Sequence, residues 1–215
     1  MKIWDIRNNF SPELASKEAA LALFKSGLVV YPTDTLYALG ANVLDTGAVR
    51  KLFALKKRSD KKPLPVMVNS ISMAKALAHI DETREKILKN FWPGPFTFIL
   101  KKKPLVSFLA TAGKNTIALR IPDHYFCHNL LNDFEGPITV TSANISGEET
   151  SADPQEIVSR FGQESLQPDL IVDGGVLPKN NPSTIIDLTG QMPKVLRVNP
   201  TNKENLMNIL KAMNL

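Results

Sequence analysis

Short apolar segments that alternate with helical patterns are the feature that most constrains how this chain can fold. Leu28–Tyr31 and Phe96–Leu100 have the length of buried strands, and no apolar stretch reaches the ~20 residues that a bilayer-spanning helix needs. Between such segments, residues of helical periodicity supply one apolar face at a time. Elements that alternate in this way pack as layers, so we predict an α/β fold with a twisted, mixed β-sheet flanked by helices.

Proline, glycine and capping residues mark where the predicted elements begin and end. The first helix is predicted to begin at Pro12, with Ser11 as its N-cap, and to stop at Gly27. Its core-facing residues are expected to be Leu14, Ala20, Leu21 and Phe24. Further helices are predicted at Ala48–Lys57, Met73–Ala78, Glu82–Asn90, His124–Leu131, after the N-cap Asp153, and at Glu204–Met213. Further strands are predicted at Leu64–Val68, at an edge or with an irregular start because of its prolines, and at Thr116–Ile121, Ile138–Thr141, Leu170–Val172, Thr184–Leu188 and Val195–Val198.

The composition indicates a single globular domain over residues 1–215. Hydrophobic residues make up 43% of the chain, and no repeat, low-complexity tract or flexible linker divides it. The only cysteine, Cys127, excludes an internal disulfide framework and is interpreted as a packed thiol rather than a nucleophile. The N-terminus lacks the apolar region of a signal peptide, so we expect a cytoplasmic protein with no membrane segment. The net charge of +5 is a mild excess that suits an anionic partner such as a nucleotide or RNA.

Small polar residues follow several of the predicted strands, where a simple turn would need only Gly or Asn. Pro32 ends one strand and is followed by Thr33, Asp34 and Thr35. The segments Thr141-Ser142-Ala143-Asn144 and Pro182-Ser183-Thr184 lie at two other strands. In open α/β sheets, ligands bind in crevices at strand ends, where such groups converge. The same residue types also build Asx and Ser/Thr turns, and that interpretation stays open.

Basic residues supply a second candidate feature. The segment ALKKRSDKK places Lys56 and Arg58 at alternate positions at the end of a predicted helix, and the spacing from Leu52 turns Lys56 inward. The two side chains could bind one polyanion, although cations also complement a helix C-terminus. Arg120 and Arg197 end two apolar strands, where a snorkelling side chain is the alternative. There is no GxxxxGK[ST] or GxGxxG sequence, so a nucleotide site would be of neither the Walker nor the Rossmann type.

Taken in order, these segments resemble the YrdC/TsaC family of threonylcarbamoyl-AMP synthases, in a short, single-domain form. The matching stretches run from about residue 28 to 197: YPTDTLYALGA, Lys56-Lys57-Arg58 followed by KPL, FWPGPFTFIL, TIALRIPDH, TSANISG, VDGG, PSTIIDL and VLR. The resemblance implies a YrdC-like domain around a large basic cavity. It also implies the reaction of ATP, L-threonine and bicarbonate to threonylcarbamoyl-AMP and pyrophosphate. That product serves N6-threonylcarbamoyladenosine formation at position 37 of tRNAs that read ANN codons.

The resemblance assigns a role to each matching position. It implies charge stabilisation on the phosphates by Lys56 and Arg58. It implies threonine contacts from Thr33, Thr35, Arg120, Thr141 and Ser183, and nucleotide contacts from Lys56, Arg58, Lys62, Thr116, Ser142, Asn144 and Arg197. Two departures concern Lys62, where Asn is common, and Met67, where some members carry a His that contacts threonine. The related YciO group loses the KxR and SAN elements, and both are present here.

The implied mechanism needs no side-chain nucleophile, and none was found in the sequence. Threonine would form a carbamate that attacks the α-phosphorus of ATP, with Mg²⁺ accompanying the nucleotide and Asp34 in an open role. The implied partners are tRNA or double-stranded RNA and the downstream tRNA threonylcarbamoyltransferase proteins. A different hypothesis is an RNA-binding module without adenylation activity, although the sequence lacks the interleaved aromatics of single-strand binders. A third is a relative with an altered carbamoyl-adenylate substrate, which Met67 keeps open.

Overall fold

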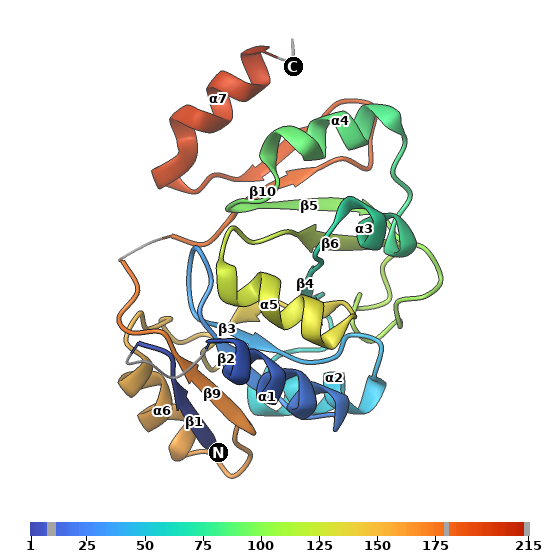
Figure 1. The fold of residues 1–215 in the computed structure, drawn as a ribbon. Coiled ribbons are helices and arrows are strands. Elements are labelled where there is room, and N and C mark those ends of the chain that lie inside the picture. The colour runs from blue at the N-terminus through green and yellow to red at the C-terminus, as the bar shows by residue number, and fades with distance from the viewer. Residues whose placement is uncertain (8–11, 179–180, 213–215) are drawn as a thin grey trace.

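The computed structural model describes residues 1–7, 12–178 and 181–212 of the chain (Figure 1). Its helices are α1 (Pro12–Phe24), α2 (Thr46–Leu55), α3 (Ile71–Leu77), α4 (Glu82–Phe91), α5 (Tyr125–Phe134), α6 (Pro154–Gly162) and α7 (Lys203–Ala212), with a 3-10 turn at Pro200–Asn202. No helix within these ranges is long and apolar enough to span a bilayer.

The strands form two mixed sheets, so the predicted α/β class is confirmed while the expected sheet is divided in two. The five-stranded sheet has the order β1 (Lys2–Asp5), β9 (Leu170–Asp173), β2 (Val29–Tyr31), β3 (Ala38–Gly40), β8 (Thr141–Ser142). The six-stranded sheet has the order β11 (Lys194–Arg197), β10 (Thr184–Asp187), β5 (Phe96–Lys101), β6 (Thr116–Arg120), β4 (Pro65–Met67), β7 (Ile138–Thr139). Because β7 and β8 are nearly continuous in the chain, the segment from Ile138 to Ser142 joins the two sheets.

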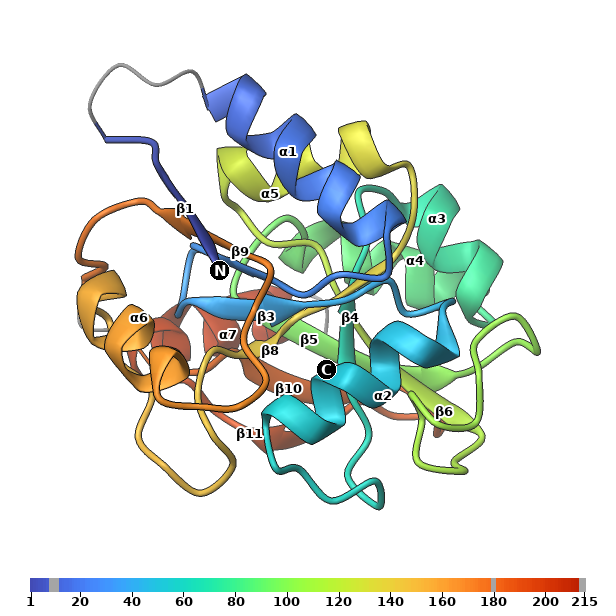
Figure 2. The same cartoon turned by 90° about the horizontal axis from the view of Figure 1, so that it is seen from below.

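The first helix packs through small side chains, contrary to the prediction. Its buried residues are Ala15, Ser16, Ala19, Ala20 and Leu23, while Leu14, Leu21 and Phe24 are at least half exposed. Of the predicted core-facing residues, only Ala20 is buried. Small side chains allow close approach to α5, which lies beside α1 in both views (Figures 1 and 2). The helix ends at Phe24, and Ser26 rather than Gly27 takes the left-handed conformation, at φ 58°. The predicted N-cap Ser11 lies outside the described residues.

Side-chain caps fix the starts of several other helices. Asp45 caps α2 by accepting hydrogen bonds from Gly47 and Ala48, and Asp153 caps α6 as predicted. The cap of α5 is His124, whose Nδ1 accepts a hydrogen bond from the Phe126 amide at 3.2 Å. These caps set the lengths of helices that cover the sheets.

Differences between the predicted and observed strands have local causes. β1 and β3 were not predicted, because each has only three or four residues and lies beside polar or glycine-containing sequence. β4 does not lie at an edge; Pro65 pairs with Ala118 on β6, and the two-residue β7 covers its other side. The prolines therefore give β4 an irregular start, the second of the two predicted possibilities.

Candidate functional site

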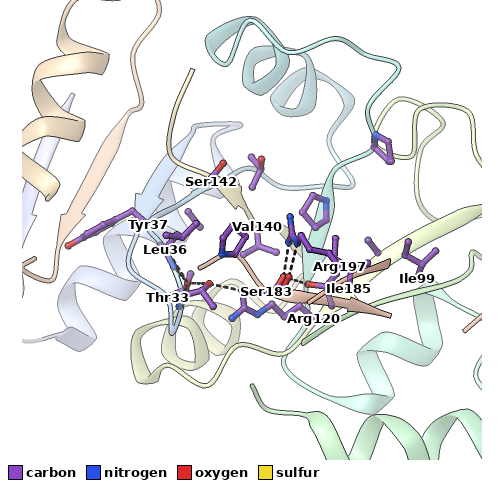
Figure 3. A pocket seen from close by; sticks show the side chains of 18 of the residues that line it. Thr33, Leu36, Tyr37, Ile99, Arg120, Val140, Ser142, Ser183, Ile185 and Arg197 are labelled. Carbon is purple, nitrogen blue, oxygen red and sulfur yellow. Dashed lines mark hydrogen bonds between the residues drawn. The ribbon is translucent and has the colours of Figure 1, made fainter. Parts of the chain in front are cut away.

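A cavity of about 340 Å³ lies where the two sheets meet (Figure 3). Its polar lining consists of Thr33, Thr35, Tyr37, Arg58, Thr97, Arg120, Thr141, Ser142, Ser183 and Arg197. Apolar lining comes from Leu36, Ala38, Pro63, Pro65, Ile99, Ala118, Val140, Pro182 and Ile185. No Asp, Glu, His, Lys or Cys is among these lining residues, whereas three arginines are. The volume falls within the range of small-molecule sites, and the charge favours an anionic ligand.

The turn after β2 is built by the hydroxyl of Thr33. Its Oγ1 accepts hydrogen bonds from the amides of Thr35 and Leu36, at 3.1 and 3.2 Å, and donates to the Leu36 carbonyl at 2.7 Å. The Thr35 hydroxyl lies 3.1 Å from it. Thr33 and Thr35 therefore form a Ser/Thr turn and also line the cavity. The two interpretations of this segment, a turn and a strand end at a crevice, apply to the same side chains.

The guanidinium group of Arg120 is held in place by three acceptors at the end of β6. It donates to the Gly94 carbonyl at 3.2 Å, to Thr35 Oγ1 at 2.9 Å and to Asp34 Oδ1 at 2.5 Å. The Arg120 and Asp34 side chains are 5% and 12% exposed, so this ion pair is largely shielded from water. Asp34, whose role the sequence left open, thus fixes the orientation of an arginine in the cavity wall.

Two further arginines approach the cavity, one from the segment after α2 and one from the end of β11. Arg58 donates to the Pro63 carbonyl at 2.9 Å, and Arg197 donates to the Ser183 carbonyl at 2.9 Å and to its hydroxyl at 3.4 Å. Burial lowers the pKa of Arg58, and burial together with the charge of Arg120 lowers the pKa of Arg197. Figure 3 shows Arg120, Ser183 and Arg197 in one wall of the cavity. Repulsion among these cations is relieved when an anion binds between them.

Lys56 is buried, as its spacing predicted, but it does not line the cavity. Its ammonium donates to the Ser142 carbonyl at 2.5 Å, to the Asn144 carbonyl at 2.7 Å and to Asn144 Oδ1 at 3.0 Å. Burial, with a smaller contribution from Arg58, lowers its pKa to about 7. The three oxygen acceptors match the three N–H bonds of the charged form. In this structure Lys56 therefore holds the SAN segment (Ser142-Ala143-Asn144) in place, with Ser142 in the cavity lining.

A second turn supports the cavity wall through Tyr37. Its hydroxyl donates to the Gly175 carbonyl at 2.7 Å and accepts from the Gly174 amide at 2.9 Å. Asp173 accepts a hydrogen bond from the Gly175 amide at 2.8 Å and forms an ion pair with Arg7 at 3.3 Å. Gly175 has φ +85°, which explains the need for glycine in this turn. The VDGG segment thus fixes a residue of the cavity wall, a role that its sequence did not indicate.

Comparison with known proteins identifies the family. A family model described as "Telomere recombination" (Sua5_yciO_yrdC) matches residues 22–199, most of the chain. The chain belongs to the Sua5/YciO/YrdC family. The resemblance inferred from the sequence motifs is therefore confirmed.

Both named branches of the Sua5/YciO/YrdC family are similar to this chain. The threonylcarbamoyl-AMP synthase of Pyrococcus abyssi is 39% identical over 79% of this chain and 49% of that protein, so the chain spans about half the length of this relative. The crystal structure of P. abyssi Sua5 complexed with L-threonine has a TM-score of 0.90 and 34% identity, over 98% of this chain and 61% of that one. The crystal structure of E. coli YciO has a TM-score of 0.83 and 32% identity, over 93% of this chain and 97% of that one.

Most of the positions that the family motifs assigned lie together. The structure places eight of them in the cavity lining: Thr33, Thr35, Arg58, Arg120, Thr141, Ser142, Ser183 and Arg197. The other four, Lys56, Lys62, Thr116 and Asn144, are not lining residues. Asn144 ends the SAN segment and accepts a hydrogen bond from the buried Lys56 through its Oδ1. Lys62 is exposed, and its carbonyl accepts a hydrogen bond from Arg58 at 3.3 Å.

The apolar lining residues were missed, although strand periodicity could have found those on β5, β6 and β10. Thr116, Ala118 and Arg120 alternate along β6, so they share one face of the sheet. Thr97 and Ile99 on β5, like Ser183 and Ile185 near β10, follow the same alternation. Thr116 lies at the end of β6 remote from Arg120, which explains why it falls outside the cavity.

Two residues discussed from the sequence lie outside this cavity. Met67 is fully buried, and its sulfur lies 3.4 Å from the Tyr31 hydroxyl, so it is not a lining residue. Cys127 is also fully buried, its thiol donates to the Pro32 carbonyl at 3.4 Å, and burial raises its pKa. The interpretation of Cys127 as a packed thiol is confirmed.

Proposed function

We propose that this chain synthesises threonylcarbamoyl-AMP from ATP, L-threonine and bicarbonate, with release of pyrophosphate. The observation that carries the proposal is a cavity in which a rigidly held arginine, Arg120, lies near two further arginines and several hydroxyl groups. Such a site provides charge for a carboxylate and for phosphates within one enclosed volume. The P. abyssi relative, which bears the name of this activity, and Sua5 crystallised with L-threonine support the same assignment.

The threonine end of the cavity is assigned to the wall formed by the segment after β2 and the end of β6. Arg120 would pair with the amino-acid carboxylate, because its guanidinium is already oriented by three acceptors. Thr33 and Thr35 shape this end through the turn that they build. Thr141 and Ser183, which also line the cavity, would contact the same ligand.

The nucleotide end is assigned to Arg58, Arg197 and Ser142. Arginine binds phosphate oxygens through two N–H bonds at once, and pairing with phosphates restores the charge balance among these buried cations. The lining residues include no carboxylate, so they do not build a site for a resident metal ion. We therefore treat Mg²⁺ as part of the substrate, MgATP, with the phosphates as its ligands.

The reaction can proceed by positioning and charge neutralisation alone. Bicarbonate and a proton give CO2 and water, the threonine amine adds to CO2, and loss of a proton gives a carbamate. The carbamate oxygen then attacks the α-phosphorus, and the bond to pyrophosphate breaks. Enclosure of both substrates raises the effective concentration of the carbamate, and the arginines offset charge on the leaving pyrophosphate.

Omission of single substrates tests this proposal. Pyrophosphate release should require ATP, L-threonine and bicarbonate together, and it should fall to background when any one is left out. Release without threonine, or no release with all three present, contradicts the assignment. Replacement of threonine by serine and by valine tests whether both the hydroxyl and the methyl group of the substrate are recognised.

A second candidate function is an RNA-binding member of the family without adenylation activity. The chain also covers almost the whole length of E. coli YciO, in addition to matching the synthases. The KxR and SAN elements, intact here, favour the synthase. We further propose that the product passes to tRNA threonylcarbamoyltransferase proteins for modification of tRNA. A protein that binds tRNA but releases no pyrophosphate would favour the alternative.

A further inference from the structure

The residue between Lys56 and Arg58 has a strained backbone. Lys57 has φ 49°, in the left-handed region that favours glycine. Its amide donates to the Ala54 carbonyl at 3.1 Å, and the Arg58 amide donates to the Phe53 carbonyl at 3.0 Å. These two hydrogen bonds form the Schellman motif that ends α2, and the usual residue at its left-handed position is glycine. With lysine at this position, the chain keeps a strain that glycine would relieve.

The position of Lys57 distinguishes it from other strained residues. The described part of the chain contains three further non-glycine residues with positive φ, namely Ser26, Ala112 and Glu135, and none of them is adjacent in sequence to a residue of the cavity lining. Lys57 directly precedes Arg58, which does line the cavity. Strained residues persist where the surrounding contacts fix them, and they cluster at ligand sites. The contacts of the Lys57 side chain are therefore expected to matter for the site.

The Lys57 side chain reaches the end of α6. Its ammonium donates to Glu164 Oε1 at 2.9 Å, and Glu164 lies 107 residues further along the chain. The side chains of Lys57 and Glu164 are 61% and 23% exposed, so the carboxylate is the more shielded partner. The Glu164 amide donates at 3.2 Å to the carbonyl of Phe161, a buried residue of α6. Because a packed helix end holds Glu164, the ion pair fixes Lys57 to a rigid element.

Helix α6 also holds the loop that follows the SAN segment. Arg160 donates to the Glu149 carbonyl at 2.5 Å, and Asn144 Nδ2 donates to the Glu148 carbonyl at 2.7 Å. Asn144 in turn accepts a hydrogen bond from Lys56 at 3.0 Å. The turn after α2 and the SAN segment are thus joined to each other through Lys56. Helix α6 contacts both of the connected segments, at Lys57 and at Glu149.

Arg58 is the cavity residue that this arrangement controls. Two of its N–H groups remain within its own segment, where they donate to the Lys62 carbonyl at 3.3 Å and to the Pro63 carbonyl at 2.9 Å. A guanidinium group has five N–H donors, so further donors are available to a ligand in the cavity. Because Arg58 directly follows Lys57, the left-handed turn sets the direction in which its side chain leaves α2.

We propose that Lys57 and Glu164 are positioning residues for the nucleotide, because their ion pair fixes the left-handed turn that presents Arg58 to the phosphates. The inference rests on the proposed function, since it takes the ligand of Arg58 to be ATP. Neither Lys57 nor Glu164 lines the cavity, so both act through Arg58 and not on the substrate. An incidental surface ion pair would affect stability alone and would leave the affinity for ATP unchanged.

Affinity for MgATP, measured by calorimetry without threonine, tests the ion pair. Glu164→Lys places two cations side by side and should weaken ATP binding roughly five- to tenfold. The exchanged variant Lys57→Glu/Glu164→Lys restores opposite charges and should recover the affinity to within about twofold of wild type. Lys57→Asn tolerates the left-handed backbone but cannot reach Glu164. It should weaken ATP binding roughly two- to fivefold, while the melting temperature stays the same or rises.

The matched control is Glu18→Lys. It reverses one charge of the exposed ion pair between Lys2 and Glu18, which lies outside the cavity, and it changes the net charge by the same amount as Glu164→Lys. Its affinity for ATP should change less than about twofold. KM for threonine should be unchanged in all of these variants, because the contacts of Arg120 remain intact.

The possible outcomes separate this inference from the proposed function. Unchanged ATP affinity in Glu164→Lys, no recovery in the exchanged variant, or an equal loss in the control overturns the positioning role. A wild-type protein that binds ATP but releases no pyrophosphate contradicts the proposed function alone, and the variants still test the ion pair. A wild-type protein that binds no ATP contradicts both. If Glu164→Lys does not fold, the affinity of Lys57→Asn decides the question.

Discussion

The ion pair between Asp34 and Arg120 gives the sharpest prediction. Asp34→Asn keeps the size of the side chain and an oxygen acceptor but removes the charge that opposes Arg120. Removal of one partner from a buried ion pair costs ~3–5 kcal/mol, and because Asn retains one acceptor we expect a loss of about 2 kcal/mol in the free energy of unfolding.

The effect on threonine follows from the orientation of Arg120. Threonine is a zwitterion, so the repulsion of its carboxylate by Asp34 and the attraction of its ammonium largely cancel. The change in affinity for threonine then depends on how well the guanidinium of Arg120 is ordered. Ordering a flexible side chain costs about 0.5–1.5 kcal/mol, so KM for threonine should rise roughly two- to twelvefold. KM for ATP should stay within about threefold, because Arg58 and Arg197 are unchanged.

Steady-state pyrophosphate release at varied threonine and at varied ATP measures both constants. Asp81→Asn is the matched control, since it breaks an Asp–Arg pair outside the reaction cavity and keeps an N-capping residue on α4. The control should leave both constants unchanged. An unchanged or lower KM for threonine in Asp34→Asn would refute the positioning role of Asp34.

Three further predictions concern two buried side chains that support the site and the N-cap of α5. Lys56→Met should lower the unfolding free energy by about 2–4 kcal/mol and kcat by at least tenfold, because carbonyls of the SAN segment lose a buried cation. Denaturant melts measure the stability and initial rates measure kcat. A variant with normal turnover would contradict this role of Lys56. Tyr37→Phe and Tyr31→Phe each remove a buried hydroxyl, and each should lower the unfolding free energy by about 1–2 kcal/mol. Only Tyr37→Phe should raise a substrate KM, because the Tyr31 hydroxyl bonds to the Thr139 carbonyl away from the cavity. Burial lowers the pKa of His124, so the unfolded chain binds more protons just below pH 6.5, and the melting temperature should fall on acidification. His124→Asn, a cap that does not titrate, should flatten that pH dependence, and an equally steep profile would disprove the cap's contribution.

The sequence predicted those features of the site that depend on local chemistry. Residue type and spacing alone reveal the hydroxyl groups after a proline-terminated strand, the inward lysine beyond Leu52 and the arginines that end two of the strands. The roles of Asp34 and Lys56 were not, because the partners of both are set by tertiary contacts. Arg120 lies 86 residues from Asp34, and Ser142 lies 86 residues from Lys56.

The less successful predictions have equally physical causes. The apolar residues Leu14, Leu21 and Phe24 were expected to face the core because they are large, yet α1 packs through alanines that allow α5 to approach. The division of the strands into two sheets could not be predicted, since it depends on how the short segment from Ile138 to Ser142 bridges them. Strand pairing of this kind is decided by packing rather than by local propensity.

Incorporation of labelled bicarbonate tests the central claim most directly. The protein would be incubated with MgATP, L-threonine and ¹³C-bicarbonate, and the adenylates formed would be identified at once by mass spectrometry. The account predicts an adenylate that contains both threonine and the labelled carbon, formed together with pyrophosphate and absent when Arg120→Ala replaces the wild-type protein. An adenylate without threonine or without the label, or no adenylate at all, would contradict it.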